Sequence, residues 1–258
     1  MEIPDPATAR VFGVSTLGCP GLPLNEVGAL LREHGVTAVQ LRCAPDEPVH
    51  IGLDAPARRA ARRQLADDGL ALLGLATYVN LSAGAPDLAP HLDLAYDLGA
   101  PALRLMPGDA KPGHAASILS AAADRSRGSG VRLLVETHDS YLRGADLAEL
   151  LAAAQAGPAV GAIWDALHPW RAGEAPAQTA AALRPWLAEL QLKDVAGRSN
   201  RTPLPPGAGI LPLREVLAEA ASAGFTGPVV LEHEARWHPD AAPIAAAITG
   251  AQRVLSAN

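Results

Sequence analysis

The sequence predicts an α/β protein folded as one (β/α)8 barrel. Short apolar runs alternate with longer amphipathic segments, eight of each, and glycine separates several of the amphipathic segments from the apolar run that follows. A length of 258 residues suits a single barrel of this kind. No linker or shift in composition divides the chain, so we expect one domain over residues 1–258. An open, doubly wound sheet is the alternative, but such a sheet usually has fewer strands.

The predicted strands are brief and apolar, as is typical of buried parallel strands. They cover Val11–Ser15, Ala38–Arg42, Ala71–Ala76, Ala102–Leu105, Arg132–Val135, Val160–Trp164, Glu189–Leu192 and Val229–Leu231. Aromatic residues are scarce, with four Trp, three Tyr and two Phe. The core is therefore expected to consist mainly of Ala, Leu and Val, which allows helices to pack tightly on a parallel sheet.

The predicted helices lie between these strands. They cover Leu24–His34, Ala55–Asp68, Asp87–Leu98, His114–Arg127, Gly144–Ala154, Ala177–Leu183, Leu213–Ala223 and Pro239–Leu255. Four of them end at a glycine that suits a left-handed helix cap, namely Gly35, Gly69, Gly99 and Gly224. An apolar strand follows within a few residues of each glycine, which indicates a repeated β/α unit.

Charge and cysteine content exclude several classes of protein. The 21 Lys and Arg against 27 Asp and Glu give a net charge of −6, which argues against binding to a nucleic-acid backbone. Cys19 and Cys43 offer neither a disulfide framework nor a CxxC motif. Residues 1–10 contain no apolar signal-peptide core, and no run approaches the ~20 apolar residues of a membrane span. We therefore expect a cytoplasmic protein with no membrane partner.

Polar side chains stand at the ends of the last four predicted strands. The relevant residues are Glu136, Asp165, Gln191 and Glu232. In a parallel barrel the carboxyl ends of the strands meet at one mouth, which is where such barrels carry their sites. Carboxylates gathered there would repel one another unless a cation neutralised them. Because all four donors are oxygens, we expect a divalent cation, Mn²⁺ or Mg²⁺ first and Co²⁺ or Zn²⁺ as alternatives.

Five segments of the second half resemble motifs of the xylose isomerase-like TIM-barrel superfamily, which includes sugar isomerases, sugar 3-epimerases, inosose dehydratases and endonuclease IV. They are Glu136-Thr137-His138, Asp165-Ala166-Leu167-His168, Gln191-Leu192-Lys193-Asp194, Pro206-Gly207-Ala208-Gly209 and Leu231-Glu232-His233-Glu234. As a set these motifs identify the superfamily well and the substrate poorly.

The resemblance implies roles for individual residues. Glu136, Asp165 and Glu232 match the family's carboxylate metal ligands. Gln191 departs from the histidine ligand of many epimerases, and it is either a fourth ligand or a buried amide satisfied by the backbone. Glu234 is the rival of Glu232 for the ligand position. The implied cofactor is one divalent cation per chain, with no organic cofactor.

The remaining predicted site residues concern substrate and proton transfer. His168 matches a substrate-facing histidine beside the metal, and we group it with Glu136 and Glu232 as catalytic. Lys193 is expected either to hold a substrate oxygen or to pair with Asp194. The further predicted substrate contacts are Asn80, Arg104, His138, Arg198 and Trp170.

The family chemistry predicts a metal-dependent sugar or sugar phosphate isomerase or epimerase, in which Glu136 and Glu232 exchange protons with the substrate. A metal-dependent dehydratase of the 3-dehydroshikimate or inosose type is the alternative, because some of those enzymes resemble this chain in having Gln at position 191. A barrel that only binds ligand is a further alternative. Endonuclease activity is rejected, because the chain lacks a histidine-rich multi-zinc site. The expected partner is a small sugar or polyol, and the resemblance implies a homodimer or homotetramer.

Overall fold

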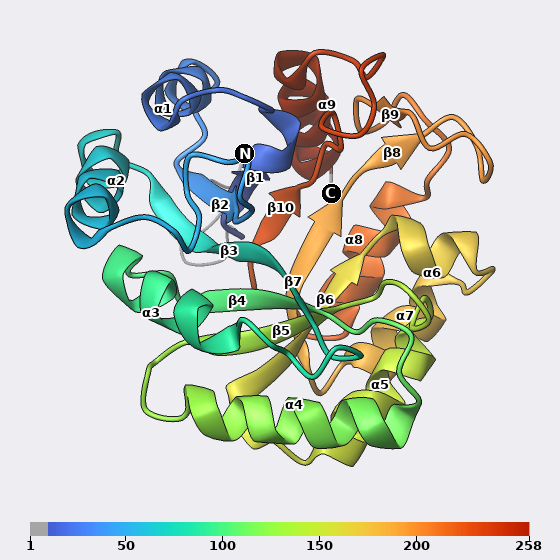
Figure 1. Ribbon diagram of the computed structural model, residues 1–258. Helices are drawn as coiled ribbons and strands as arrows, with labels where there is room; N and C mark the ends of the chain where they lie inside the picture. The colour runs from blue at the N-terminus through green and yellow to red at the C-terminus, as the bar shows by residue number, and fades with distance from the viewer. Residues whose placement is uncertain (1–9, 258) are drawn as a thin grey trace.

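The computed structural model describes residues 10–257, in which eight parallel strands close into a barrel (Figure 1). The order around the barrel is β1-β10-β7-β6-β5-β4-β3-β2, and each strand pairs in parallel with both neighbours. The barrel strands are β1 (Phe12–Ser15), β2 (Ala38–Arg42), β3 (Ala71–Asn80), β4 (Ala102–Met106), β5 (Arg132–Glu136), β6 (Val160–Asp165), β7 (Leu187–Leu192) and β10 (Val229–Leu231). The prediction of an α/β barrel is confirmed.

Helices surround the barrel on its outside (Figure 1). They are α1 (Leu24–Glu33), α2 (Ala55–Asp67), α3 (Leu88–Leu98), α4 (Pro112–Ser126), α5 (Gly144–Ala154), α6 (Leu167–Arg171), α7 (Pro176–Leu183), α8 (Leu213–Ser222) and α9 (Ile244–Ser256). Short 3-10 turns cover Thr16–Gly18 and Gly157–Ala159, and the two-residue strands β8 (Asp194–Val195) and β9 (Pro203–Leu204) form an antiparallel pair. Helix α9 closes the ring beside α1, where Gln252 donates a hydrogen bond to the His34 carbonyl (2.8 Å).

Differences from the sequence-based expectation at β3, the last helix and α6 affect the site or its surroundings. Strand β3 continues past Ala76 to Asn80, because Asn80 pairs with Met106 of β4 after a register shift. The last helix begins at Ile244 rather than Pro239, since Pro243 takes an extended conformation at its N-terminal cap. Helix α6 was not expected, and it carries His168 directly after β6.

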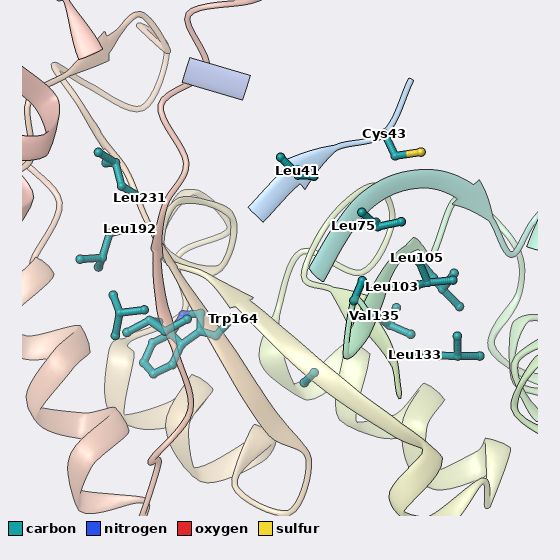
Figure 2. Packing of buried hydrophobic residues seen from close by; sticks show 14 of the residues in the cluster. Leu41, Cys43, Leu75, Leu103, Leu105, Leu133, Val135, Trp164, Leu192 and Leu231 are labelled. Carbon is teal, nitrogen blue, oxygen red and sulfur yellow. The ribbon is translucent and has the colours of Figure 1, made fainter. Parts of the chain in front are cut away.

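Along each strand the side chains point alternately toward the surrounding helices and into the barrel interior. Leu103, Leu105, Leu133, Val135 and Trp164 are nearly or fully buried, and they belong to the main apolar cluster (Figure 2). Because neighbouring residues of a strand face opposite sides, the residue between two such leucines faces the interior. The packing of the helices thus fixes which polar side chains enter the barrel.

Asp194 organises the loop after β7. Its carboxylate accepts backbone N–H groups of Val195, Gly207, Gly209 and Leu211 at 2.8–3.1 Å. A Cβ atom on Gly209 would lie 2.2 Å from Asp194 Oδ1, so only glycine allows this close approach. The glycine-rich segment is therefore a loop held by one buried carboxylate.

The expectations about membrane spans, the N-terminal segment and the cysteines can be compared with the structure. Within residues 10–257, none of the helices has both the length and the apolar character needed to cross a membrane. The N-terminal segment that was expected to lack a signal peptide includes residues 1–9, which lie outside the described residues. Cys19 and Cys43 are both buried and free, in agreement with the absence of a predicted disulfide framework.

Asp194→Ala is expected to lower the free energy of unfolding by about 2–4 kcal/mol, because four buried or partly buried N–H groups lose a charged acceptor. For a chain of this length that corresponds to a thermal midpoint lower by roughly 5–15 °C. Circular dichroism melting measures the change. Asp93→Ala, at an exposed position of α3, is the control and should leave the midpoint unchanged. An equal midpoint in both variants would show that Asp194 does not hold the loop.

Candidate active site

Three buried carboxylates converge at the carboxyl ends of β5, β6 and β10. Glu136 ends β5, Asp165 ends β6, and Glu232 directly follows β10. Their exposed fractions are at most 2%, and one oxygen of each lies within 4.8 Å of the others. The strand ends that were singled out in the sequence are therefore brought together as expected.

Arg104 lies between two of these carboxylates. It comes from β4, and its Nη1 is 3.0 Å from Glu136 Oε2 and 2.9 Å from Glu232 Oε1. Its guanidinium also stands 5.5 Å from the ring centre of Tyr78. The two glutamates are thus bridged by a protein cation, which reduces their mutual repulsion.

Lys193 supplies a second buried cation. Its Nζ lies 2.6 Å from Asp165 Oδ2, 2.5 Å from Glu232 Oε2 and 2.7 Å from Glu234 Oε1. The alternative in which Lys193 pairs with Asp194 is wrong, because Asp194 turns to the loop after β7 and accepts only backbone N–H groups there. Glu234, the rival of Glu232, is separated from the three-carboxylate cluster by this lysine.

Burial and ion pairs shift the pKa values of these groups in different directions. Burial raises the pKa of Glu136 well above its ordinary value, with Arg104 opposing the effect. Burial acts on Glu232 in the same direction, but Lys193 and Arg104 outweigh it and lower the pKa of that carboxylate. Desolvation of Lys193 is likewise outweighed by Asp165, Glu232 and Glu234, so its pKa is raised and it remains charged.

Gln191 lies beside Asp165, with which it is paired in register between β6 and β7. Its Nε2 donates to Glu189 Oε1 at 3.2 Å, and Gln40 of β2 donates to the same oxygen at 2.8 Å. Burial raises the pKa of Glu189 to about 7, against the lowering effect of these two hydrogen bonds. Gln191 is therefore satisfied on its amide nitrogen by a side chain and not by the backbone.

His168 lies on α6, with Nε2 at 3.6 Å from Asp165 Oδ2. Burial lowers its pKa to about 4, so the imidazole is neutral at physiological pH. The His138 ring packs edge-on against it with centroids 4.5 Å apart, and His138 Nδ1 lies 2.8 Å from Asp139 Oδ1. A neutral imidazole beside the carboxylates is suited to accepting a proton.

A cavity of about 400 Å³ opens above the carboxylates. Its walls are formed by Leu17, Tyr78, Asn80, Arg104, Met106, Glu136, His138, Asp139, Glu232, Glu234 and Trp237. Arg42 fixes the two aromatic walls, since its guanidinium lies 5.3 Å from the ring centres of both Tyr78 and Trp237. The volume is at the lower end of the range for small-molecule sites.

The predicted substrate contacts fall into two groups. Asn80, Arg104 and His138 line the cavity. Arg198 and Trp170 do not line it; they stack on each other, with the guanidinium 4.4 Å from the indole ring centre, and Arg198 donates to the Trp170 and Arg171 carbonyls. Their contact fastens the loop after β7 to α6 and leaves both side chains occupied.

The residues present fit a divalent cation. Among the described residues, Gln191 Oε1 is a buried side-chain oxygen without a hydrogen-bond partner. Glu136 Oε2 and Asp165 Oδ2 are buried as well and lie 3.0 Å from Arg104 and 2.6 Å from Lys193, respectively. When all are ionised, the four carboxylates at positions 136, 165, 232 and 234 face the two cations Arg104 and Lys193, which leaves two negative charges. A hard divalent ion would take oxygen ligands and neutralise that remainder.

Sequence reasoning missed several residues around the site. Glu189 stands two positions before Gln191, so strand alternation alone places it on the same interior face. Tyr78 was missed because β3 was expected to end at Ala76, whereas a period-two reading through Asn80 brings it to the mouth. Gln40 and Arg42 are polar residues at alternating positions of β2, and Arg42 ends that strand, so the strand-end criterion applied to the later strands could have found them.

Comparison with known proteins yields a family and a set of similar folds. A family model described as xylose isomerase-like TIM barrel matches residues 29–255. No curated protein sequence matches the chain.

Three solved structures illustrate the likeness. The zinc-bound IolI protein has a TM-score of 0.81 at 14% identity, covering 96% of this chain and 99% of its own. The probable 3-DHS dehydratase AsbF from Bacillus anthracis has a TM-score of 0.75 at 16% identity, with 93% and 98% covered. D-psicose 3-epimerase from Clostridium cellulolyticum H10, solved with D-tagatose, has a TM-score of 0.76 at 13% identity, with 96% and 97% covered. At these identities the likeness concerns the fold.

Arg104→Met is expected to lower the free energy of unfolding of chelator-treated protein by about 3–5 kcal/mol, because two buried carboxylates lose their partner. The pKa of Glu136 is already raised in the folded state and rises further without Arg104. The folded variant then binds protons more tightly than the unfolded chain, so its stability falls as pH rises.

Urea unfolding at pH 5 and pH 8 measures this effect, and the loss should be larger at pH 8. Arg127→Met, which removes an exposed pair with Asp124, is the control and should change stability by less than about 1 kcal/mol at both values. A loss of equal size at both pH values would contradict an electrostatic role for Arg104.

Proposed function

Because the chain belongs to the xylose isomerase-like TIM barrel family, we propose that it is a divalent-metal-dependent isomerase or epimerase of a small sugar or sugar phosphate. One observation carries the proposal. Carboxylate oxygens of Glu136, Asp165 and Glu232 converge within 4.8 Å of one another, and Glu136 and Glu232 line a cavity of about 400 Å³. This arrangement supports chemistry at a carbon beside a carbonyl group.

Glu136, Asp165, Gln191 and Glu232 would hold the cation, with Mn²⁺ or Mg²⁺ favoured by the all-oxygen donor set. When bound, a divalent cation acts as a Lewis acid that polarises the substrate carbonyl and acidifies the neighbouring C–H group. The similarity to the zinc-bound IolI protein supports a divalent cation, and the similarity to D-psicose 3-epimerase supports epimerase chemistry.

Glu136 and Glu232 would move the proton. Their surroundings shift their pKa values in opposite directions, raised for Glu136 and lowered for Glu232. Two carboxylates separated in this way suit complementary roles, with Glu232 accepting the proton and Glu136 donating one. Arg104 contacts both residues through its Nη1 atom.

The cavity walls favour a small substrate with an apolar face and several hydroxyl groups. Tyr78 and Trp237 are 42% and 53% exposed at the mouth, so their rings are open to a ligand. Asn80, His138 and Asp139 supply hydrogen-bonding groups on the remaining wall. Sugars and cyclic polyols combine these two features.

A metal-dependent dehydratase is the second candidate, and His168 is the observation that favours it. The imidazole is neutral, both of its nitrogens lack a hydrogen-bond partner among the described residues, and it lies beside Asp165 and Lys193. Such a base can remove a proton from carbon while a hydroxyl on the adjacent carbon leaves as water and a double bond forms. The similarity to the probable 3-DHS dehydratase AsbF is consistent with this chemistry.

Glu136→Gln and Glu232→Gln are each expected to lower turnover at least about 10³-fold, because each removes a group that exchanges the proton. Mn²⁺-loaded protein is incubated with a panel of ketoses and ketose phosphates in D₂O, and deuterium incorporation is followed by NMR. Elemental analysis of each variant shows whether the cation is retained. Glu174→Gln, a carboxylate that accepts the Gly144 N–H far from the cavity, is the control. Near-wild-type turnover in either site variant would contradict the two-carboxylate mechanism.

His168→Asn separates the two candidates. If the protein eliminates water from a cyclic hydroxyketone, this variant should form the conjugated product at least about 100-fold more slowly. The absorbance of that product measures the rate. If it isomerises or epimerises ketoses, deuterium exchange should persist within about tenfold of wild type, since Glu136 and Glu232 remain. Wild-type protein that produces neither exchange nor a conjugated product would overturn both assignments.

A further inference from the structure

We propose that Glu189 is a positioning residue that fixes the amide of Gln191, so that Gln191 presents its oxygen to the cation. The inference rests on the proposed function, because it requires a cation between the carboxylates. It concerns a side chain that lies inside the barrel, two residues before Gln191 on β7. It goes further than the proposed ligand set, which leaves the orientation of the amide open.

Glu189 is a buried carboxylate held by two amides. It is 1% exposed, and a single oxygen, Oε1, accepts Gln191 Nε2 at 3.2 Å and Gln40 Nε2 at 2.8 Å. Gln40 comes from β2, which is separated from β7 by β1 and β10 in the barrel. The carboxylate is therefore anchored to another part of the barrel wall as well as to its own strand.

This contact decides which end of the Gln191 amide faces the site. Glu189 Oε1 accepts a hydrogen bond from Gln191 Nε2, so the NH₂ end of the amide faces Glu189 and the carbonyl end faces away from it. With Nε2 committed to Glu189, Oε1 is directed elsewhere. Within residues 10–257 that oxygen is buried and has no hydrogen-bond partner, which is costly unless a ligand completes it.

The neighbour of Gln191 identifies that ligand. Gln191 is paired in register with Asp165, whose Oδ2 is buried and lies 2.6 Å from Lys193 Nζ. Asp165 in turn belongs to the cluster with Glu136 and Glu232. An amide oxygen at this point completes an all-oxygen site, and the contact with Glu189 orients it much as carboxylates orient metal-binding histidines.

A double-mutant cycle on Mn²⁺ affinity tests the proposal, using the full chain after removal of metal and Mn²⁺ alone as the probe. Glu189→Gln keeps the side-chain shape but adds an NH₂ donor, which permits the Gln191 amide to turn over. We expect it to weaken Mn²⁺ binding 10- to 100-fold, measured as free Mn²⁺ by EPR titration. Gln191→Ala should weaken binding by a comparable factor, and the double variant no more than Gln191→Ala alone.

Controls separate positioning from a loss of structure. In the presence of chelator, the thermal unfolding midpoint of Glu189→Gln should stay within a few degrees of the wild-type midpoint. A general loosening of the barrel would instead lower both the midpoint and the Mn²⁺ affinity. Glu174→Gln, which alters a carboxylate that contacts the Gly144 N–H and Thr179, should change neither quantity.

Unchanged Mn²⁺ affinity in Glu189→Gln, or effects of the two substitutions that multiply in the double variant, would overturn the inference. If wild-type protein still binds Mn²⁺ and turns over a ketose in that case, the proposed function stands and only the role of Glu189 fails. If wild-type protein neither binds Mn²⁺ nor turns over substrate, both are overturned.

Discussion

The ion pairs of Arg104 with Glu136 and Glu232 are the interaction on which the barrel interior depends. Three acidic side chains are packed there with almost no contact with water, and their desolvation is compensated only by charges of the protein itself. Lys193 completes this arrangement by joining Asp165 to Glu232. Arg104 and Lys193 therefore hold the three carboxylates close to one another.

The same strands that build the apolar core place these charges. On β4, Leu103 and Leu105 belong to the apolar cluster, and the intervening Arg104 is thereby turned into the barrel. On β5, Leu133 and Val135 belong to the apolar cluster, so Glu136, the next residue after Val135, is turned into the barrel. A one-residue slip of either strand would expose leucine to the interior and bury the charge among the helices. Core packing thus enforces the register that the site needs.

Strand-end reasoning predicted the barrel and the meeting of Glu136, Asp165 and Glu232, because parallel strands share one mouth and each end is marked by a polar residue after an apolar run. It could not predict which charged side chains pair with one another. Lys193 pairs with the site carboxylates rather than with Asp194 because Asp194 contacts the loop after β7. That contact joins residue 194 to residues 207–211 and depends on how the loop folds back. Arg198 does not line the cavity for a similar reason, since its stacking on Trp170 depends on the position of α6.

Gln191 shows how such a site selects a cation. Histidine and glutamine are both neutral, so exchanging one for the other leaves the two uncompensated negative charges of the cluster unchanged. What changes is the donor atom, from imidazole nitrogen to amide oxygen, and this moves the preference from Zn²⁺ toward Mn²⁺ or Mg²⁺. In the proposed site the charge of the ion would be set by how many carboxylates remain after Arg104 and Lys193 are paired. Its chemical type would be set by a single amide, whose Nε2 donates to the buried Glu189.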